Sequence, residues 1–248
     1  MPLSSTHLTL ARDGAELRPR ALGPDRLAAL LEVLAGQPPD VAGVRLFGVE
    51  GLRPLLDPGG EIGALAAGVM EGVPRPVRAI LFDKTPAANW SLAWHQDRVV
   101  AVRERVEVAG FGPWTRKHGA LHVAPPFEVL ARMLTLRVHL DAVPQSNAPL
   151  LIAPGSHRLG RIAEGEVGAV VARCGTAACL ADAGDVWIYA TAILHASERA
   201  TARAAGGLCG GGAAGRVGVV GGLEGLATRS ADGRPAHPKS KLSRIRGE

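Results

Sequence analysis

The chain has 248 residues, of which 47% are hydrophobic and 21% charged, a balance typical of one packed domain with appendages rather than a collagen, a coiled coil or a disordered chain. No apolar run approaches the roughly 20 residues of a membrane-spanning helix, and no basic segment followed by an apolar one opens the sequence. The net charge of +5 lies entirely in residues 203–248, so we expect neither a nucleic-acid partner nor a membrane partner for the body of the chain.

The N-terminal third is predicted to be mainly helical. Residues 7–10 and 15–17, on either side of Asp13-Gly14, suggest a short hairpin. Pro24 then opens an apolar pattern with helical spacing, which Gly36 is expected to end, and residues 62–70 predict a second helix.

From residue 77 onward, short extended segments alternate with turn residues. The clearest strand is 134–141, where even positions are aliphatic and odd positions polar, the period of a strand buried on one face. Residues 150–152 predict a buried strand that the turn Pro154-Gly155-Ser156 ends. Two more strands are expected at 185–189 and 192–194. This organisation favours a mainly β sandwich or barrel, supported by the N-terminal helices.

These patterns predict one domain over residues 1–202, with helical support in 1–76 and a β core in 77–202. Residues 203–248 form an atypical tail with 12 of the 32 glycines, no aromatic residue and little periodicity outside 217–220. Such a tail is a poor source of the closing strand that a β-sandwich needs. An out-of-frame reading of the gene and disorder are the two interpretations we consider for it.

The cysteines are Cys174, Cys179 and Cys209. Their odd number and wide spacing argue against a disulfide framework and against a four-ligand zinc site. A reducing, cytoplasmic location is therefore expected.

A metal site is suggested by His95-Gln96-Asp97, because residues i and i+2 of a strand project to the same face. One later histidine would complete two histidines and one carboxylate around iron(II), with positions left open for a co-substrate and oxygen. The pattern alone is weak, since His139-Leu140-Asp141 also matches it and a hydrogen-bonded strand histidine is the simpler interpretation of either pair.

Three segments that occur in the same order along the chain support the interpretation of His95-Gln96-Asp97 as a metal site. They are Trp94-His95-Gln96-Asp97-Arg98, the run from Asn147 through Pro154-Gly155-Ser156-His157 to Arg158, and Leu194-His195-Ala196-Ser197. Together they resemble the phytanoyl-CoA dioxygenase family of Fe(II)/2-oxoglutarate oxygenases over about residues 78–201. The resemblance implies a double-stranded β-helix, a jelly roll of the cupin kind, with supporting helices.

The same resemblance implies His95, Asp97 and His195 as catalytic iron ligands. It implies Ser197 as a contact for the distal carboxylate of 2-oxoglutarate, because that family position helps to hold it. Further contacts for the co-substrate or the substrate are Arg137 and Lys84, each with a solvated or ion-paired role as the alternative.

Three other residues of the matching region have structural interpretations. His157 is interpreted as a loop residue bonded to nearby backbone rather than as a ligand. Trp90 and Trp94 are interpreted either as walls of the pocket or as ordinary core residues.

One expected part is missing. The family places an arginine about 11 residues after the distal histidine, where its fork binds the co-substrate carboxylate in a bidentate way. Here that position is Gly206, and Arg203 is the nearby candidate in the tail. Read in another frame with C at each wobble position, codons 202–207 encode a run of arginines. We therefore hypothesise that the tail is an out-of-frame reading.

The implied function is that of an Fe(II)- and 2-oxoglutarate-dependent dioxygenase that uses O2 to hydroxylate a small molecule while it decarboxylates the co-substrate to succinate and CO2. The first alternative is an inactive or truncated family member that binds metal or a small ligand without turnover, which the missing arginine favours. The second is a cupin-like metal enzyme that does not use 2-oxoglutarate.

Overall fold

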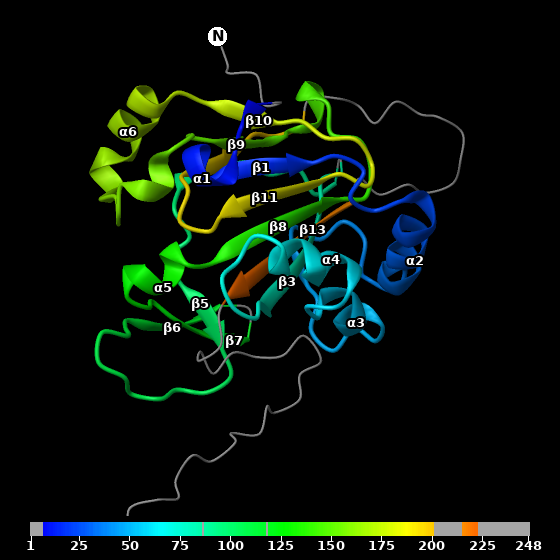
Figure 1. The fold of residues 1–248 in the computed structure, drawn as a ribbon, viewed down its shortest axis with the longest axis horizontal. Helices are drawn as coiled ribbons and strands as arrows, with labels where there is room; N and C mark the ends of the chain where they lie inside the picture. Colours follow the sequence, from blue (N-terminus) through cyan, green and yellow to red (C-terminus); the bar gives the residue numbers. More distant parts are fainter. Residues whose placement is uncertain (1–6, 86, 118, 201–214, 223–248) are drawn as a thin grey trace, which may run out of the picture.

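The computed structural model describes residues 7–85, 87–117 and 119–200, together with the backbone of strand 215–222. Two sheets face each other, and helices cover their outer sides (Figure 1). Among the described residues, no helix is long and apolar enough to cross a membrane. The mainly β architecture with supporting helices confirms the predicted fold class.

The larger sheet has six strands in the order β1-β11-β8-β13-β3-β2. Successive side chains along each strand point to opposite faces of this sheet. In β8, Leu136 and Val138 pack into the core formed with the helices, whereas Thr135 and Arg137 line a cavity on the opposite face. The strands are β1 (Ala15–Arg18), β2 (Val44–Arg45), β3 (Arg75–Asp83), β8 (Leu134–His139), β11 (Val186–Ala190) and β13 (Gly215–Gly222).

The smaller sheet has four strands in the order β10-β9-β12-β4. Its inner face joins that of the larger sheet in one core, in which Ile152 and Cys179 pack with Trp187 and Tyr189. A separate three-stranded sheet, β5-β7-β6, packs beside β3 around Val77. These strands are β4 (Leu92–His95), β9 (Leu150–Ile152), β10 (Ala177–Cys179), β12 (His195–Ser197), β5 (Val100–Val102), β6 (Trp114–Lys117) and β7 (Ala120–Val123).

The helices form two groups. Helix α2 begins with Pro24, whose fixed φ suits the first helical position, and it buries Leu30 and Leu34. It lies with α3 and α4 on one side of the molecule, while α6 covers the smaller sheet on the other (Figure 1). The helices are α1 (Leu10–Asp13), α2 (Pro24–Leu34), α3 (Leu52–Leu56), α4 (Glu61–Ala67), α5 (Phe127–Ala131) and α6 (Val167–Cys174), with 3-10 turns η2 (Gln145–Asn147), η3 (Ser156–Arg158) and η4 (Glu164–Glu166).

The predicted hairpin near the N-terminus is wrong. The Asp13 N–H donates to the Thr9 carbonyl at 2.8 Å, which closes the helical turn α1, and Gly14 ends it with a left-handed φ of 79°. Strand β1 therefore pairs with the distant β11 rather than with its sequence neighbour. The N-terminal third also contributes β2 to the large sheet, beyond the helices that were expected there.

The predicted strand at 192–194 is also wrong. These residues form a turn, in which the Ile193 N–H donates to the Ala190 carbonyl at 3.0 Å, and strand β12 begins only at His195. The three apolar side chains are buried all the same. The apolar character of residues 192–194 therefore indicates burial, but it does not indicate a strand.

The closing strand comes from the tail whose composition predicted a poor one. Strand β13 lies between β8 and β3 and pairs antiparallel with both. It includes residues 217–220, the one part of the tail with strand periodicity. The proposed domain boundary at residue 202 and the out-of-frame hypothesis stay predictions.

Candidate metal centre

Two histidines meet across the smaller sheet. In the antiparallel pairing of β12 with β4, His195 lies directly opposite His95, and the ring centroids are 4.3 Å apart. The Nδ1 atoms lie 2.8 Å from the Ala93 carbonyl and 2.9 Å from the Ile193 carbonyl, for His95 and His195 respectively. With Nδ1–H donating to these carbonyls, each Nε2 atom keeps a lone pair for a metal.

The carboxylate of Asp97 completes the group. Asp97 lies just beyond the end of β4, and ligand atoms of His95, Asp97 and His195 all lie within 4.8 Å of one another. Burial lowers the pKa of His195, the neighbouring His95 lowers it further, and Asp97 and the Ile193 carbonyl act in the opposite direction. Neutral imidazoles with one carboxylate are a donor set that fits octahedral iron(II).

Gln96, between two of these residues, points to the opposite side and fixes the segment. Its side-chain amide donates to the carbonyls of Ala192 at 2.8 Å and Gly160 at 3.1 Å, and its oxygen accepts from the Ile162 N–H at 2.9 Å. This buried amide joins the segment before Asp97 to the turn before His195. Sequence reasoning missed this role, which the alternation of faces along His95-Gln96-Asp97 could have indicated.

The Pro-Gly-Ser-His turn supports the distal histidine. Gly155 has a φ of 80°, a left-handed conformation that glycine adopts without strain. The next residue, fully buried Ser156, accepts a hydrogen bond from the Leu194 N–H at 2.9 Å. The ring of half-buried His157 packs against Gly14. The pKa of His157 is lowered, and burial is the largest cause. His157 is not among the three residues of the metal group, but its buried Nδ1 has no hydrogen-bond partner among the described residues, so the expected bond to nearby backbone is not found.

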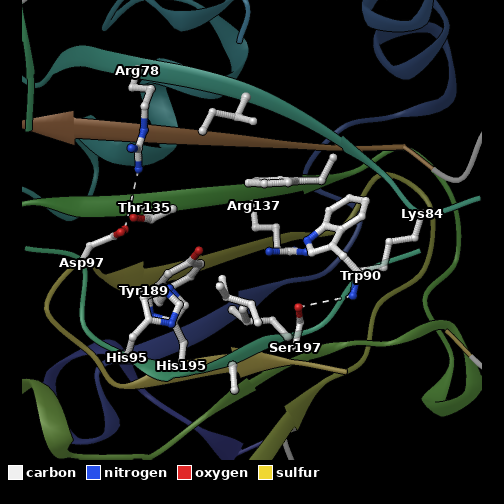
Figure 2. Close-up of a pocket in the computed structure, with 15 residues that line it drawn as sticks. Arg78, Lys84, Trp90, His95, Asp97, Thr135, Arg137, Tyr189, His195 and Ser197 are labelled. Carbon is white, nitrogen blue, oxygen red and sulfur yellow. Dashed lines mark hydrogen bonds and ion pairs between the residues drawn. The ribbon is translucent and has the colours of Figure 1, made fainter. Parts of the chain in front are cut away.

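The metal group lies on one wall of a cavity between the two sheets (Figure 2). At the end away from Asp97, the Lys84 ammonium donates to the Ser197 hydroxyl at 3.3 Å and to the Glu198 carbonyl. The same ammonium lies 5.2 Å from the centroid of the Trp90 ring. This end therefore joins a cation and a hydroxyl with an aromatic wall.

Arg137 enters the cavity from β8 (Figure 2). Its guanidinium carbon lies 5.6 Å from the centre of the Phe82 ring, and Tyr189 lines the same cavity. Burial raises the pKa of Tyr189 to about 12, although Arg137 acts against that rise. Arg137 is only 7% exposed, and its Nε has no hydrogen-bond partner among the described residues. A buried donor of this kind can bind an anionic ligand.

The cavity brings together six of the seven residues that the sequence suggested for the site, and Arg203, like Gly206, lies outside the described residues. Trp90 lines the cavity, whereas Trp94 packs with the core under α6. Sequence reasoning missed three polar lining residues. Their signal was strand alternation, which puts each on the cavity face of its strand: Arg78 on β3, Thr135 on β8 and Tyr189 on β11.

The comparisons with known proteins agree with this geometry. The model of the phytanoyl-CoA dioxygenase (PhyH) family matches residues 55–205. Because the match spans more than half of the chain, the chain belongs to this family. The enzyme class and the cofactor set expected from the sequence, Fe(II), 2-oxoglutarate and O2, are thereby confirmed. No curated protein matches the chain in sequence.

Solved structures share the fold at low sequence identity. AviO1 from Streptomyces viridochromogenes Tue57 is 20% identical, with a TM-score of 0.58, and the match covers 88% of this chain and 93% of that one. The non-heme alpha-ketoglutarate-dependent epimerase SnoN from nogalamycin biosynthesis is 17% identical, with a TM-score of 0.61 and coverages of 96% and 93%. HygX from Streptomyces hygroscopicus, with nickel and 2-oxoglutarate bound, is 14% identical, with a TM-score of 0.57 and coverages of 92% and 92%.

Proposed function

We propose that this chain is an Fe(II)- and 2-oxoglutarate-dependent dioxygenase that hydroxylates a small molecule and releases succinate and CO2. The observation that carries the proposal is the convergence of His95, Asp97 and His195, with ligand atoms within 4.8 Å, on the wall of a cavity that has a cationic end. When bound, iron and 2-oxoglutarate would supply the chemistry that activates O2, the oxidant of the reaction. The residues of the chain bind and orient them.

Iron binding is assigned to His95, Asp97 and His195. The backbone carbonyls that accept from both Nδ1 atoms hold the rings in the tautomer in which Nε2 binds metal. Two histidines and one carboxylate leave open positions on the metal, which a bidentate co-substrate and O2 require.

The distal carboxylate of 2-oxoglutarate is assigned to the end of the cavity formed by Lys84, Ser197 and Arg137. Lys84 and Ser197 are already within hydrogen-bond distance of each other, so one carboxylate can contact both. Arg137 adds a buried guanidinium whose Nε atom has no hydrogen-bond partner in the described part of the chain. Charged donors in a site with little water bind carboxylates strongly, and these residues take the role that the family gives to the arginine expected at residue 206. Arg203 stays a further candidate from the sequence.

The decisive experiment is 2-oxoglutarate binding by the purified, Fe(II)-loaded protein without oxygen, followed by the visible charge-transfer band of the iron chelate. The band is expected in the wild type and should be absent from His95→Ala. Substrate screening by succinate release then identifies the reaction. Oxygen consumption that does not depend on 2-oxoglutarate would instead support the cupin-like enzyme without this co-substrate.

The second candidate is a family member that binds metal without turnover. The family match ends at residue 205, immediately before Gly206, which favours this candidate. Iron uptake without the charge-transfer band would support it. The gene sequence tests the related out-of-frame hypothesis, because an alternate frame that encodes no strand with the expected arginine would exclude it.

A small molecule is the substrate class that the cavity between the sheets supports. One structure of HygX contains hygromycin B with nickel and 2-oxoglutarate, so a relative in fold accommodates a small molecule together with the co-substrate. For the location we propose the cytoplasm. Cys174 and Cys179 are both unpaired thiols, which suits a reducing compartment.

A further inference from the structure

The cavity would keep a net positive charge even after the metal and the co-substrate have bound. Its described lining includes three cationic side chains, Arg78, Lys84 and Arg137, and one carboxylate, Asp97. A divalent iron adds two positive charges, and 2-oxoglutarate brings only two negative ones. The loaded site therefore keeps a net positive charge, which favours a third, anionic component.

The surplus charge lies at the Arg78 end of the cavity. Arg78 reaches in from β3 toward Asp97, on the opposite side from Lys84 (Figure 2). Its Nη2 atom is 3.7 Å from the Asp97 Oδ2 atom, and the side chain is 18% exposed. When Asp97 shares its charge with a divalent metal, it neutralises Arg78 only partly. A guanidinium that is accessible and only partly neutralised remains beside the metal.

A second guanidinium lies next to Arg78 on the same face of the sheet. Arg45 of β2 is directly opposite Ile80 of β3 in the antiparallel register. Because Arg78 is two residues before Ile80, it is the diagonal neighbour of Arg45, and such neighbours are close enough for long side chains to interact. Burial lowers the pKa of Arg45 and so does Arg78, and the buried Nε atom of Arg45 has no hydrogen-bond partner among the described residues.

Like charges at neighbouring positions on one face of a sheet repel each other, so an anion that binds beside both guanidinium groups is favoured. We propose that Arg78, assisted by Arg45, binds an anionic group of the substrate, a carboxylate or a phosphate. Paired oxygens of either group match the fork of a guanidinium, which is what distinguishes arginine from lysine at such a site. This inference rests on the proposed function, since it takes 2-oxoglutarate to occupy the Lys84 end. It makes Arg78 a determinant of substrate specificity.

The test uses the full chain loaded with Ni(II) in place of Fe(II) and saturated with 2-oxoglutarate, so that the co-substrate fills its own end of the cavity. Inorganic phosphate and acetate are the two probes, titrated separately by calorimetry at low ionic strength. At least one should bind the wild type. Arg78→Gln should weaken that binding at least tenfold and Arg45→Gln severalfold, while Arg173→Gln, an exposed change on α6, should leave it unchanged.

The outcomes separate this inference from the proposed function. Tighter binding of phosphate assigns a phosphorylated substrate, and tighter binding of acetate assigns a carboxylate. No binding of either anion by a wild type that binds 2-oxoglutarate would overturn the inference alone. Failure to bind 2-oxoglutarate would overturn the proposed function and the inference with it.

A role of Arg78 limited to supporting Asp97 predicts a different set of results. Arg78→Gln would then lose Ni(II) affinity, and Arg45→Gln, which alters no contact of a metal ligand, would bind the anions as the wild type does. That result also overturns the inference. Unchanged Ni(II) and 2-oxoglutarate affinities in Arg45→Gln, combined with weaker anion binding, support it.

Discussion

The hydroxyl of Ser156 accepts a hydrogen bond from the backbone N–H of Leu194 at 2.9 Å, one residue before the distal histidine. The turn that follows β9 is thereby attached to the start of β12. The Ala153 N–H, which donates to the Leu194 carbonyl at 3.0 Å, adds a second bond between the same segments. The position of His195 is thus set by a motif far from it in sequence.

Ser156→Ala is expected to weaken metal binding and stability together. The substitution leaves a buried N–H without its acceptor, which costs about 1–3 kcal/mol of unfolding free energy. Urea denaturation and Ni(II) titration measure the two effects. Ser91→Ala, an exposed serine, is the matched control. Equal stability and Ni(II) affinity in both variants would show that the motif does not position His195.

Arg137→Met is expected to raise the dissociation constant of 2-oxoglutarate about tenfold or more, because a lost charge-assisted hydrogen bond costs about 1.5–3 kcal/mol. Titration of the charge-transfer band in anaerobic Fe(II) protein measures it. Arg173→Met controls for the general loss of an arginine. Iron affinity should not change, since Arg137 is not one of the three proposed ligands. An unchanged dissociation constant would leave co-substrate binding to Lys84 and Ser197.

The stability of the fold is expected to fall as the pH decreases below about 6.5, partly through His122 of β7. This side chain is buried, and burial lowers its pKa most, followed by repulsion from Arg78, Lys117 and Arg45. The unfolded chain therefore takes up a proton that the folded chain does not. Stability from this residue is complete above the unfolded pKa and is lost below it, by up to about 1.4 kcal/mol per pH unit.

Urea denaturation between pH 8 and 5 measures this dependence on metal-free protein. The variant His122→Gln removes the titrating group, so its unfolding free energy should depend less on pH than that of the wild type. An identical slope in both proteins would assign the dependence to other groups. His157, whose pKa burial also lowers, is the second residue to test.

Truncation after residue 202 is expected to abolish cooperative unfolding, whereas truncation after residue 222 should preserve it. The first removes β13 and leaves the facing edges of β3 and β8 without their hydrogen-bond partners, and the second retains that strand. Thermal unfolding followed by circular dichroism compares the two. Cooperative unfolding of the shorter protein would mean that the large sheet forms without β13.

The alternation in residues 134–141 shows what the sequence can and cannot reveal. It predicted the strand correctly, and β8 spans Leu134–His139. It also suggested one solvent-exposed face, but Thr135, Arg137 and His139 are all buried. A polar face toward water and a polar face toward a cavity have the same pattern. Only the opposing sheet distinguishes them.

The site was predictable to different degrees. The spacing of His95 and Asp97 suggested that they share a face, and the resemblance supplied His195, which no local pattern connects to them. Arg78 was not predicted as a site residue, because no local pattern distinguishes a polar side chain that faces a cavity from one that faces water. The order of strands in a sheet is a long-range property, so no local signal could show that β12 would pair with β4.

The central place of β13 has a consequence for how the chain folds during synthesis. Strands β1, β11 and β8 lie on one side of it, and β3 and β2 lie on the other. The ribosome makes β13 after all five, so the two parts of the large sheet have no shared hydrogen bonds until it arrives. The edges of nascent β3 and β8 lack hydrogen-bond partners until then. Chaperones that bind exposed strands would act on the chain during this period.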